Sequence, residues 1–184
     1  MKHKLIIINT FLVLGLSAVV VLGGRELFAA QAEHEFVGVT KCSMCHKKPE
    51  KGEQFKIWQE SKHAKAFETL KTPEAKEQAA KLGIADPSTS GKCLKCHSTA
   101  YGFTEAKVTD VIPVEEGISC ESCHSPGKDY MKKSIMENKE EAIANGLVIP
   151  DEQVCRKCHN PEAPTFKDFN FKERWEKIKH PVPK

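Results

Sequence analysis

The eight cysteines of the chain form four pairs, and each second cysteine is followed directly by a histidine. Two thiols separated by two residues can form thioethers with the two vinyl groups of one porphyrin. The adjacent histidine then lies under the iron as its proximal ligand. The four copies of this unit are Cys42/Cys45/His46, Cys93/Cys96/His97, Cys120/Cys123/His124 and Cys155/Cys158/His159. The sequence therefore predicts four covalently bound haems of the c type.

Paired cysteines at this spacing are also typical of zinc sites, and of disulfides in exported proteins. A single Cys-x-x-Cys-His unit would leave those alternatives open. Four units with no cysteine left over, behind an apolar N-terminal segment, favour haem attachment.

Each iron also needs a sixth ligand or has an open site. Outside the motifs and the N-terminal segment, three histidines remain: His34, His63 and His180. We predict His63 and His180 as distal ligands because apolar residues near them would face a haem, and His34 as a third candidate. Three histidines cannot close four sites. At least one iron is therefore expected to be five-coordinate, to bind another side chain such as Met131 or Met136, or to take a ligand from another subunit. For the two methionines, filling gaps beside a helix is the simpler interpretation.

The N-terminal segment begins with two lysines and continues with an almost wholly apolar run over residues 5–24. Ala30-Gln31-Ala32 offers a cleavage site before Glu33, so residues 1–32 are expected to be an export signal. Twenty apolar residues are also enough to cross a bilayer, which makes a retained membrane anchor the alternative. Both interpretations place residues 33–184, the predicted tetrahaem domain, on the periplasmic or cell-surface side.

The exported part is short for four haems, so the haems are expected to form much of its core. The 28 basic and 25 acidic residues of the whole chain are interleaved, without a Lys/Arg block, which does not indicate a nucleic-acid partner.

The elements that must position the motifs are predicted to be helices joined by long irregular loops. Periodic apolar residues indicate helices over 53–70, from Thr72-Pro73 to Gly83, over 129–145 and over 170–179. Asn170 and Glu173 have the spacing of a capping box. Residues 108–112 are expected to be extended. The predicted fold class is mainly α, a compact multihaem cytochrome c fold packed around four haems.

The chain resembles the tetrahaem cytochromes of the cytochrome c-554 type. The resemblance rests on HAKAF at residues 63–67, on GISCESCHSPG at residues 117–127 and on a final Phe-rich helix ending at His180. It implies a mainly helical fold with haems in stacked and angled pairs, and electron transfer in the periplasm. It further implies that His63 and His180 are distal ligands and that the haem of Cys93, Cys96 and His97 is five-coordinate.

One departure concerns the stretch after the third motif, where the family has a distal histidine. This chain has Asp129-Tyr130-Met131-Lys132-Lys133 there, which puts the sixth ligand of another haem, expected to be the first, in question. His34 is a candidate replacement.

The leading hypothesis is an electron carrier between redox partner proteins, not an enzyme. The alternative is a haem enzyme that reduces a small nitrogen oxide or peroxide at a five-coordinate haem. A third hypothesis is a subunit of a larger complex or homo-oligomer, in which a histidine is supplied by a neighbouring chain.

Overall fold

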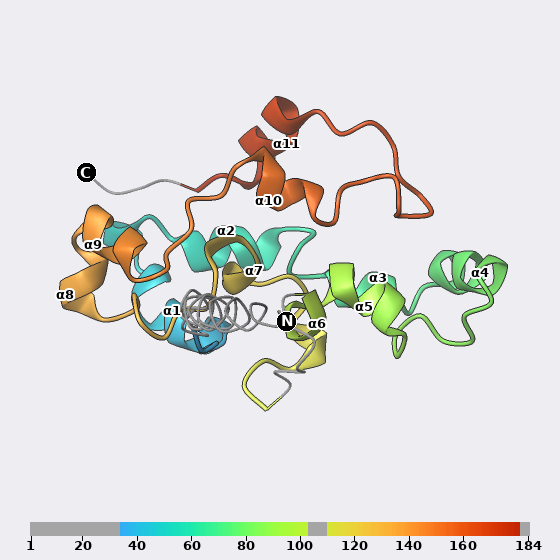
Figure 1. Cartoon of the computed structure of the whole chain (residues 1–184), viewed down its shortest axis with the longest axis horizontal. Helices are drawn as coiled ribbons and strands as arrows, with labels where there is room; N and C mark the ends of the chain where they lie inside the picture. The colour runs from blue at the N-terminus through green and yellow to red at the C-terminus, as the bar shows by residue number, and fades with distance from the viewer. Residues whose placement is uncertain (1–33, 103–109, 181–184) are drawn as a thin grey trace, which may run out of the picture. The chain divides into compact units, whose positions relative to one another are not determined.

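A computed structural model describes residues 34–102 and 110–180 of the chain, and all regular structure in these ranges is helical (Figure 1). The predicted mainly α class is therefore confirmed. The predicted N-terminal signal or anchor lies outside the described residues. Of the stretch expected to be extended, residues 108 and 109 also lie outside them, whereas residues 110–112 form a turn and a bend, so that expectation is wrong for the described part. Within the described ranges, no helix is both long enough and apolar enough to cross a membrane.

The helices are short and connected by long turns and loops. They are α1 (Val39–His46), η1 (Pro49–Lys51), α2 (Gln54–Glu60), α3 (Ala66–Thr69), α4 (Pro73–Lys81), α5 (Gly91–His97), α6 (Thr99–Gly102), η2 (Val114–Glu116), α7 (Cys120–His124), α8 (Lys133–Met136), α9 (Lys139–Ala144), α10 (Glu152–Arg156) and α11 (Phe171–Ile178). α1 packs against α2 and α7, whereas α5 packs against α3 and α6.

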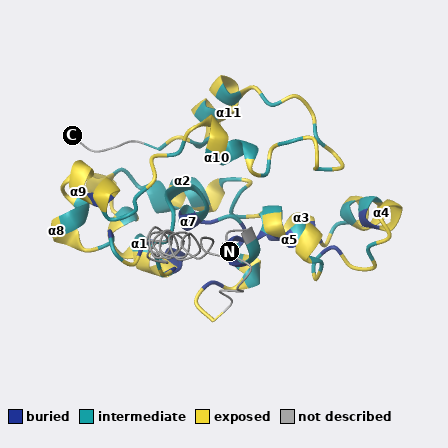
Figure 2. Ribbon diagram, in the orientation of Figure 1, coloured by how far each residue is buried: buried dark blue, intermediate teal, exposed yellow. Residues whose placement is uncertain are grey.

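Buried apolar side chains are few in the described ranges, and six of them form two small clusters. One contains Phe36, Ala100 and Ile112. The other contains Phe67, Leu70 and Leu94. Figure 2 shows only scattered buried segments between long half-buried and exposed ones. So little buried apolar surface fits a chain whose interior is completed by large prosthetic groups.

The prediction of a single helix over residues 53–70 is wrong. The stretch is divided into α2 and α3 at Ser61, whose backbone is extended (ψ 164°). The Ser61 hydroxyl accepts hydrogen bonds from the N–H groups of His63 and Ala64, at 3.2 and 3.4 Å. Serine often competes with the helix in this way. As a result, His63 lies in a turn and not on a helix face.

The helix predicted over residues 129–145 is likewise two shorter ones, α8 and α9. Asn138 separates them by capping α9, because its side chain accepts a hydrogen bond from the Glu141 N–H at 3.1 Å. The predicted stop at Gly146 is confirmed, with a φ of +100° that favours glycine.

Two predicted helix starts are confirmed. Thr72 caps α4 by accepting a hydrogen bond from Ala75 N–H at 3.2 Å, with Pro73 at the first helical position. Asn170 caps α11 through the Glu173 N–H at 3.2 Å. The Glu173 carboxylate binds Lys177, 2.6 Å away.

Candidate haem-binding site

Three of the four motif histidines have their Nδ1 atoms held by hydrogen bonds. His97 Nδ1 lies 2.8 Å from the Ala66 carbonyl oxygen, and His124 Nδ1 lies 3.0 Å from the Val148 carbonyl oxygen. His46 Nδ1 lies 3.2 Å from the amide oxygen of Gln54. A carbonyl oxygen only accepts, so each Nδ1 carries the proton and each Nε2 keeps its lone pair. Imidazoles that bind metals are usually oriented in this way.

His63 faces the fourth motif. Its ring centroid lies 6.0 Å from that of His159, at an interplanar angle of 76°. Burial lowers the pKa of His63, and the nearby His159 lowers it further. Burial also lowers the pKa of His159. Both imidazoles are therefore kept neutral, the form that binds a metal.

His180 faces the third motif in the same manner. Its ring centroid lies 5.7 Å from that of His124. Burial lowers the pKa of both rings. The Nδ1 atom of His180 is buried without a hydrogen-bond partner in the described part of the chain.

The two imidazole pairs have the spacing of two ligands on opposite sides of one metal. A ring nitrogen lies about 1.1 Å from its centroid and metal–imidazole bonds are about 2.0–2.1 Å, so trans ligands have centroids about 6.2–6.4 Å apart. The observed 6.0 and 5.7 Å are close to this range. The residues present therefore fit two bis-histidine haems.

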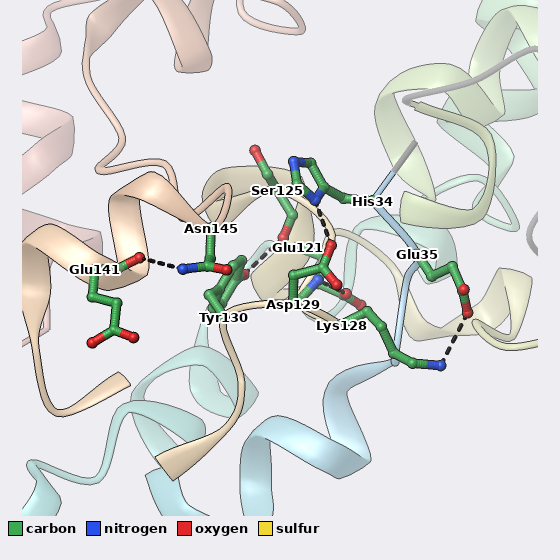
Figure 3. A network of polar contacts seen from close by, with 10 residues as sticks. His34, Glu35, Glu121, Ser125, Lys128, Asp129, Tyr130, Glu141 and Asn145 are labelled. Atoms are coloured by element: carbon green, nitrogen blue, oxygen red, sulfur yellow. Dashed lines mark hydrogen bonds and ion pairs between the residues drawn. The ribbon is translucent and has the colours of Figure 1, made fainter. Parts of the chain in front are cut away.

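The other two motifs lack such a pairing. Among residues 34–102 and 110–180, no ring contact joins His46 or His97 to a further histidine. His34 instead forms a hydrogen bond with Asp129, with Nδ1 and Oδ2 2.6 Å apart (Figure 3).

Cysteines of different motifs lie close together. A hydrogen bond between the thiols of Cys42 and Cys120 lowers the pKa of Cys42 and raises that of Cys120. A hydrogen bond with the Cys158 thiol likewise lowers the pKa of Cys96 to about 7.

The third and fourth motifs meet through another pair of cysteines. Burial, reinforced by the nearby Cys155, raises the pKa of Cys123 to about 11. Taken with the other two contacts, this places the motifs next to one another in the order first, third, fourth, second.

Cys45 is more exposed than expected, because a haem-attachment residue in a core made largely of haem should be at least partly buried. It is exposed, whereas the other seven motif cysteines are half-buried. The reason is its place in the fold: α1 ends one residue later, and residues 47–51, which follow, are exposed as well. Cys42, one turn earlier, lies instead against the third motif. Attachment through Cys45 therefore stays a prediction, and a haem held there would have one edge at the surface rather than in the core.

The segment before the third motif supports the His63 turn. The Ile118 N–H donates to the His63 carbonyl at 2.9 Å. The indole N–H of Trp58 donates to the Ile118 carbonyl at 2.7 Å. On the other side, the Thr99 hydroxyl accepts from the Ser119 N–H at 2.7 Å. Residues 117–119 therefore connect the distal ligand of one predicted haem to the attachment motif of another.

Gly117 allows this close approach. Its φ is +72°, and a Cβ there would lie 2.7 Å from the His63 carbonyl oxygen and 2.8 Å from that of Ala64. Gly83 makes a matched comparison, because its φ is +68° but a Cβ would meet nothing within 4 Å.

We expect Gly83→Ala to lower the free energy of unfolding by about 1 kcal/mol through its positive φ alone. Gly117→Ala should cost a further 1–3 kcal/mol, roughly, for the overlap. It should also disturb the low-spin signal of the iron that His63 faces. Denaturant unfolding and electron paramagnetic resonance (EPR) of both holoprotein variants test this. If Gly117→Ala and Gly83→Ala lowered the free energy of unfolding equally, the close approach of Gly117 to the His63 turn would not contribute to stability.

Sequence reasoning missed Glu121, which lies between the two cysteines of the third motif and is 1% exposed. Its carboxylate accepts three backbone hydrogen bonds, from Val37 N–H at 3.0 Å, Gly38 N–H at 2.9 Å and Gly127 N–H at 2.7 Å. Because Gly38 directly precedes α1, one buried side chain holds the start of the first motif's helix against the third motif. An acidic residue inside a motif gives no sign of such a role before the fold is known.

Glu116 lies near the same carboxylate, and one of its oxygens, Oε1, is buried without a hydrogen-bond partner in the described ranges. Burial, reinforced by the Glu121 charge, raises the pKa of Glu116 above its ordinary 4.5. A carboxyl group with a raised folded-state pKa stabilises the fold most below its unfolded pKa, and that contribution is lost as the pH rises through the folded pKa.

We therefore expect Glu116→Gln to raise the melting temperature at pH 7 and to have little effect near pH 4. Thermal unfolding at both pH values, with the exposed Glu115→Gln as control, measures this. A variant less stable than the wild type at pH 7 would contradict the assignment.

The chain is similar to known cytochromes. Residues 41–125 match the family described as cytochrome c554 and c-prime. Cytochrome c-554 of Nitrosomonas europaea is 33% identical over 147 residues, which are 78% of this chain and 57% of that protein. The chain thus spans a little over half the length of this curated relative. The structure of reduced cytochrome c554 from Nitrosomonas europaea aligns with a TM-score of 0.61 and 26% identity, over 80% of this chain and 85% of that one. The chain is thus homologous to cytochrome c-554 of Nitrosomonas europaea and matches the cytochrome c554 family over residues 41–125.

Proposed function

We propose that the chain binds four c-type haems and carries electrons between redox partner proteins outside the cytoplasm. The haems would be held through the eight motif cysteines, with His46, His97, His124 and His159 as proximal ligands. When bound, each haem supplies a one-electron couple, and the protein adjusts its potential through axial ligands and burial.

The observation that carries this proposal is the pair of buried histidine couples, His63 with His159 and His124 with His180. With haem bound, the two imidazoles of each couple would hold one iron between them and leave no position for a substrate, as suits a carrier. The proximity of the motifs to one another adds support, because electron exchange requires cofactors held close together.

Removal of one attachment site at a time tests the cofactor assignment. In a host that matures c-type cytochromes, the wild type should carry four haems per chain by intact mass. Changing both cysteines of any one motif to serine should leave three. A wild-type chain with fewer than four covalent haems would overturn the proposal.

The compartment is testable separately. The N-terminal segment should direct the chain across the cytoplasmic membrane, and its deletion should abolish haem attachment. Deletion variants that still carry covalent haem would exclude an extracytoplasmic site of assembly.

A second candidate function rests on His97. Its Nδ1 is fixed by Ala66 and Thr69, yet no other imidazole contacts it among the described residues. An open iron there would let the chain reduce a small nitrogen oxide or a peroxide. Carbon monoxide added to the reduced holoprotein should then shift the Soret band of one haem in four. An unchanged spectrum would exclude an accessible open haem and the enzymatic function with it.

A further inference from the structure

His34 uses one ring nitrogen, Nδ1, in a hydrogen bond, and no residue of the described ranges is bonded to the other. Its Nδ1 is bound by the Asp129 carboxylate at 2.6 Å, so the proton on the neutral ring lies at Nδ1 (Figure 3). A carboxylate on the far nitrogen fixes the tautomer and the orientation of metal-binding histidines. This contact joins residues 95 positions apart, and it falls on the stretch after the third motif.

Gly146 lies against the face of this ring. A Cβ at Gly146 would lie 2.8 Å from Nε2, 3.0 Å from Cε1 and 3.1 Å from Cδ2 of His34. Three nearly equal distances place that position above the ring plane and not along the Nε2 lone pair. The backbone therefore supports the imidazole from one face, and the in-plane direction of Nε2 is not directed at Gly146.

Elimination among the four proximal histidines indicates which iron His34 would serve. His124 and His159 already face other imidazoles, and His97 is anchored to α3 through Ala66. The remaining proximal histidine is His46, the last residue of α1.

The backbone just after His34 leads to the same region. Val37 and Gly38, directly before α1, are bound to Glu121 inside the third motif. The adjacent Glu35 holds Lys128 through both its backbone and its side chain. His34 therefore lies beside the first and third motifs.

We propose that His34, positioned by Asp129, is the sixth ligand of the iron held at the first motif. This inference rests on the proposed four-haem function. Asp129 acts through His34: hydrogen bonding to the carboxylate makes the ring a stronger donor, which favours the ferric state and lowers the potential of that haem.

Spin-state counting by EPR of the oxidised holoprotein tests the ligand. The wild type should contain at most one high-spin iron. His34→Gly should add one, and millimolar imidazole should convert that iron back to low spin. Met131→Leu, in the same stretch, should change nothing. Two high-spin irons in the wild type, or a folded His34→Gly variant with no added one, would overturn the assignment.

A second variant separates positioning from ligation. Asp129→Asn should keep the low-spin count and raise the midpoint potential of one haem, whereas Lys132→Ala, at an exposed position of the same stretch, should leave all four potentials in place. An Asp129→Asn protein with four unshifted potentials would reduce the contact to a surface ion pair and remove the positioning role. The midpoint potentials of Asp129→Asn also test the inference if the His34→Gly variant fails to incorporate haem.

The failure of this inference can be told from failure of the proposed function. Four attached haems that accept electrons, two of them high-spin, would contradict only the His34 assignment. A count other than four would contradict the proposed function itself.

Discussion

Replacing His63 by alanine will convert one low-spin ferric iron of the holoprotein to high spin and open that iron to carbon monoxide. The expected change is large because His63 is the imidazole that faces His159, at 6.0 Å between ring centroids, in a buried setting that keeps it neutral. His63→Met should keep the iron six-coordinate and raise its potential, on the order of 0.1 V within the roughly 0.8 V that axial ligands span. EPR and spectroelectrochemical titration report the two effects.

His180→Ala supplies the matched comparison. It should open a different iron, the one at the third motif, so that the double variant carries two added high-spin irons. If either single variant retained its full low-spin signal, or if the double variant gained only one high-spin iron, the pairing of these histidines with His159 and His124 would be wrong.

Replacing Glu121 by alanine should produce the largest loss of stability in the chain. Three backbone N–H groups would lose their acceptor, those of Gly38 and Gly127 buried and that of Val37 partly buried. Each buried donor without a partner costs about 1–3 kcal/mol, so the loss should reach at least about 2 kcal/mol. Glu121→Gln should be intermediate, since one carboxylate oxygen becomes an amide nitrogen that cannot accept a hydrogen bond. Guanidinium unfolding followed by circular dichroism measures both.

Glu115→Ala is the control, because Glu115 is exposed and nearby in sequence. Its effect should stay within about 0.5 kcal/mol, as for most surface substitutions. Similar losses for Glu121→Ala and Glu115→Ala would contradict the role of Glu121 in joining the first and third motifs. A selective loss should be accompanied by altered magnetic interaction between the haems of those two motifs.

The sequence was sufficient for features that depend on local chemistry. The caps at Thr72 and Asn170 followed from residue type and position. The helix breaks at Ser61 and Asn138 were not predicted, because apolar residues continue at helical spacing across both positions. The side chains of Ser61 and Asn138 bind backbone N–H groups and thereby divide the predicted helices. Asn138 followed three residues later by Glu141 is a helix-start signal that could have divided the second helix.

Cysteine and histidine spacing predicted the attachment residues but not their surroundings. All four motifs have the same spacing, yet Cys45 is exposed and the other seven cysteines are half-buried. Exposure is set by which segments pack beside each motif, and the motif itself carries no information about that.

Other features depend on contacts between distant segments. His63 and His159 are 96 positions apart, and no periodicity predicts that their rings meet. The role of Glu121 needs Val37 and Gly38 brought to it by the fold. Gly117 is similar: its requirement for glycine comes from the carbonyl oxygens of the His63 turn, not from its own neighbours in sequence.

The most direct test of the central claim is a coulometric redox titration of the purified holoprotein. Four covalently held haems with largely closed axial sites predict reversible uptake of four electrons per chain, with the same spectra in the reductive and oxidative directions. Uptake of fewer than four electrons, or a titration that cannot be reversed, would contradict the account of this chain as a tetrahaem electron carrier.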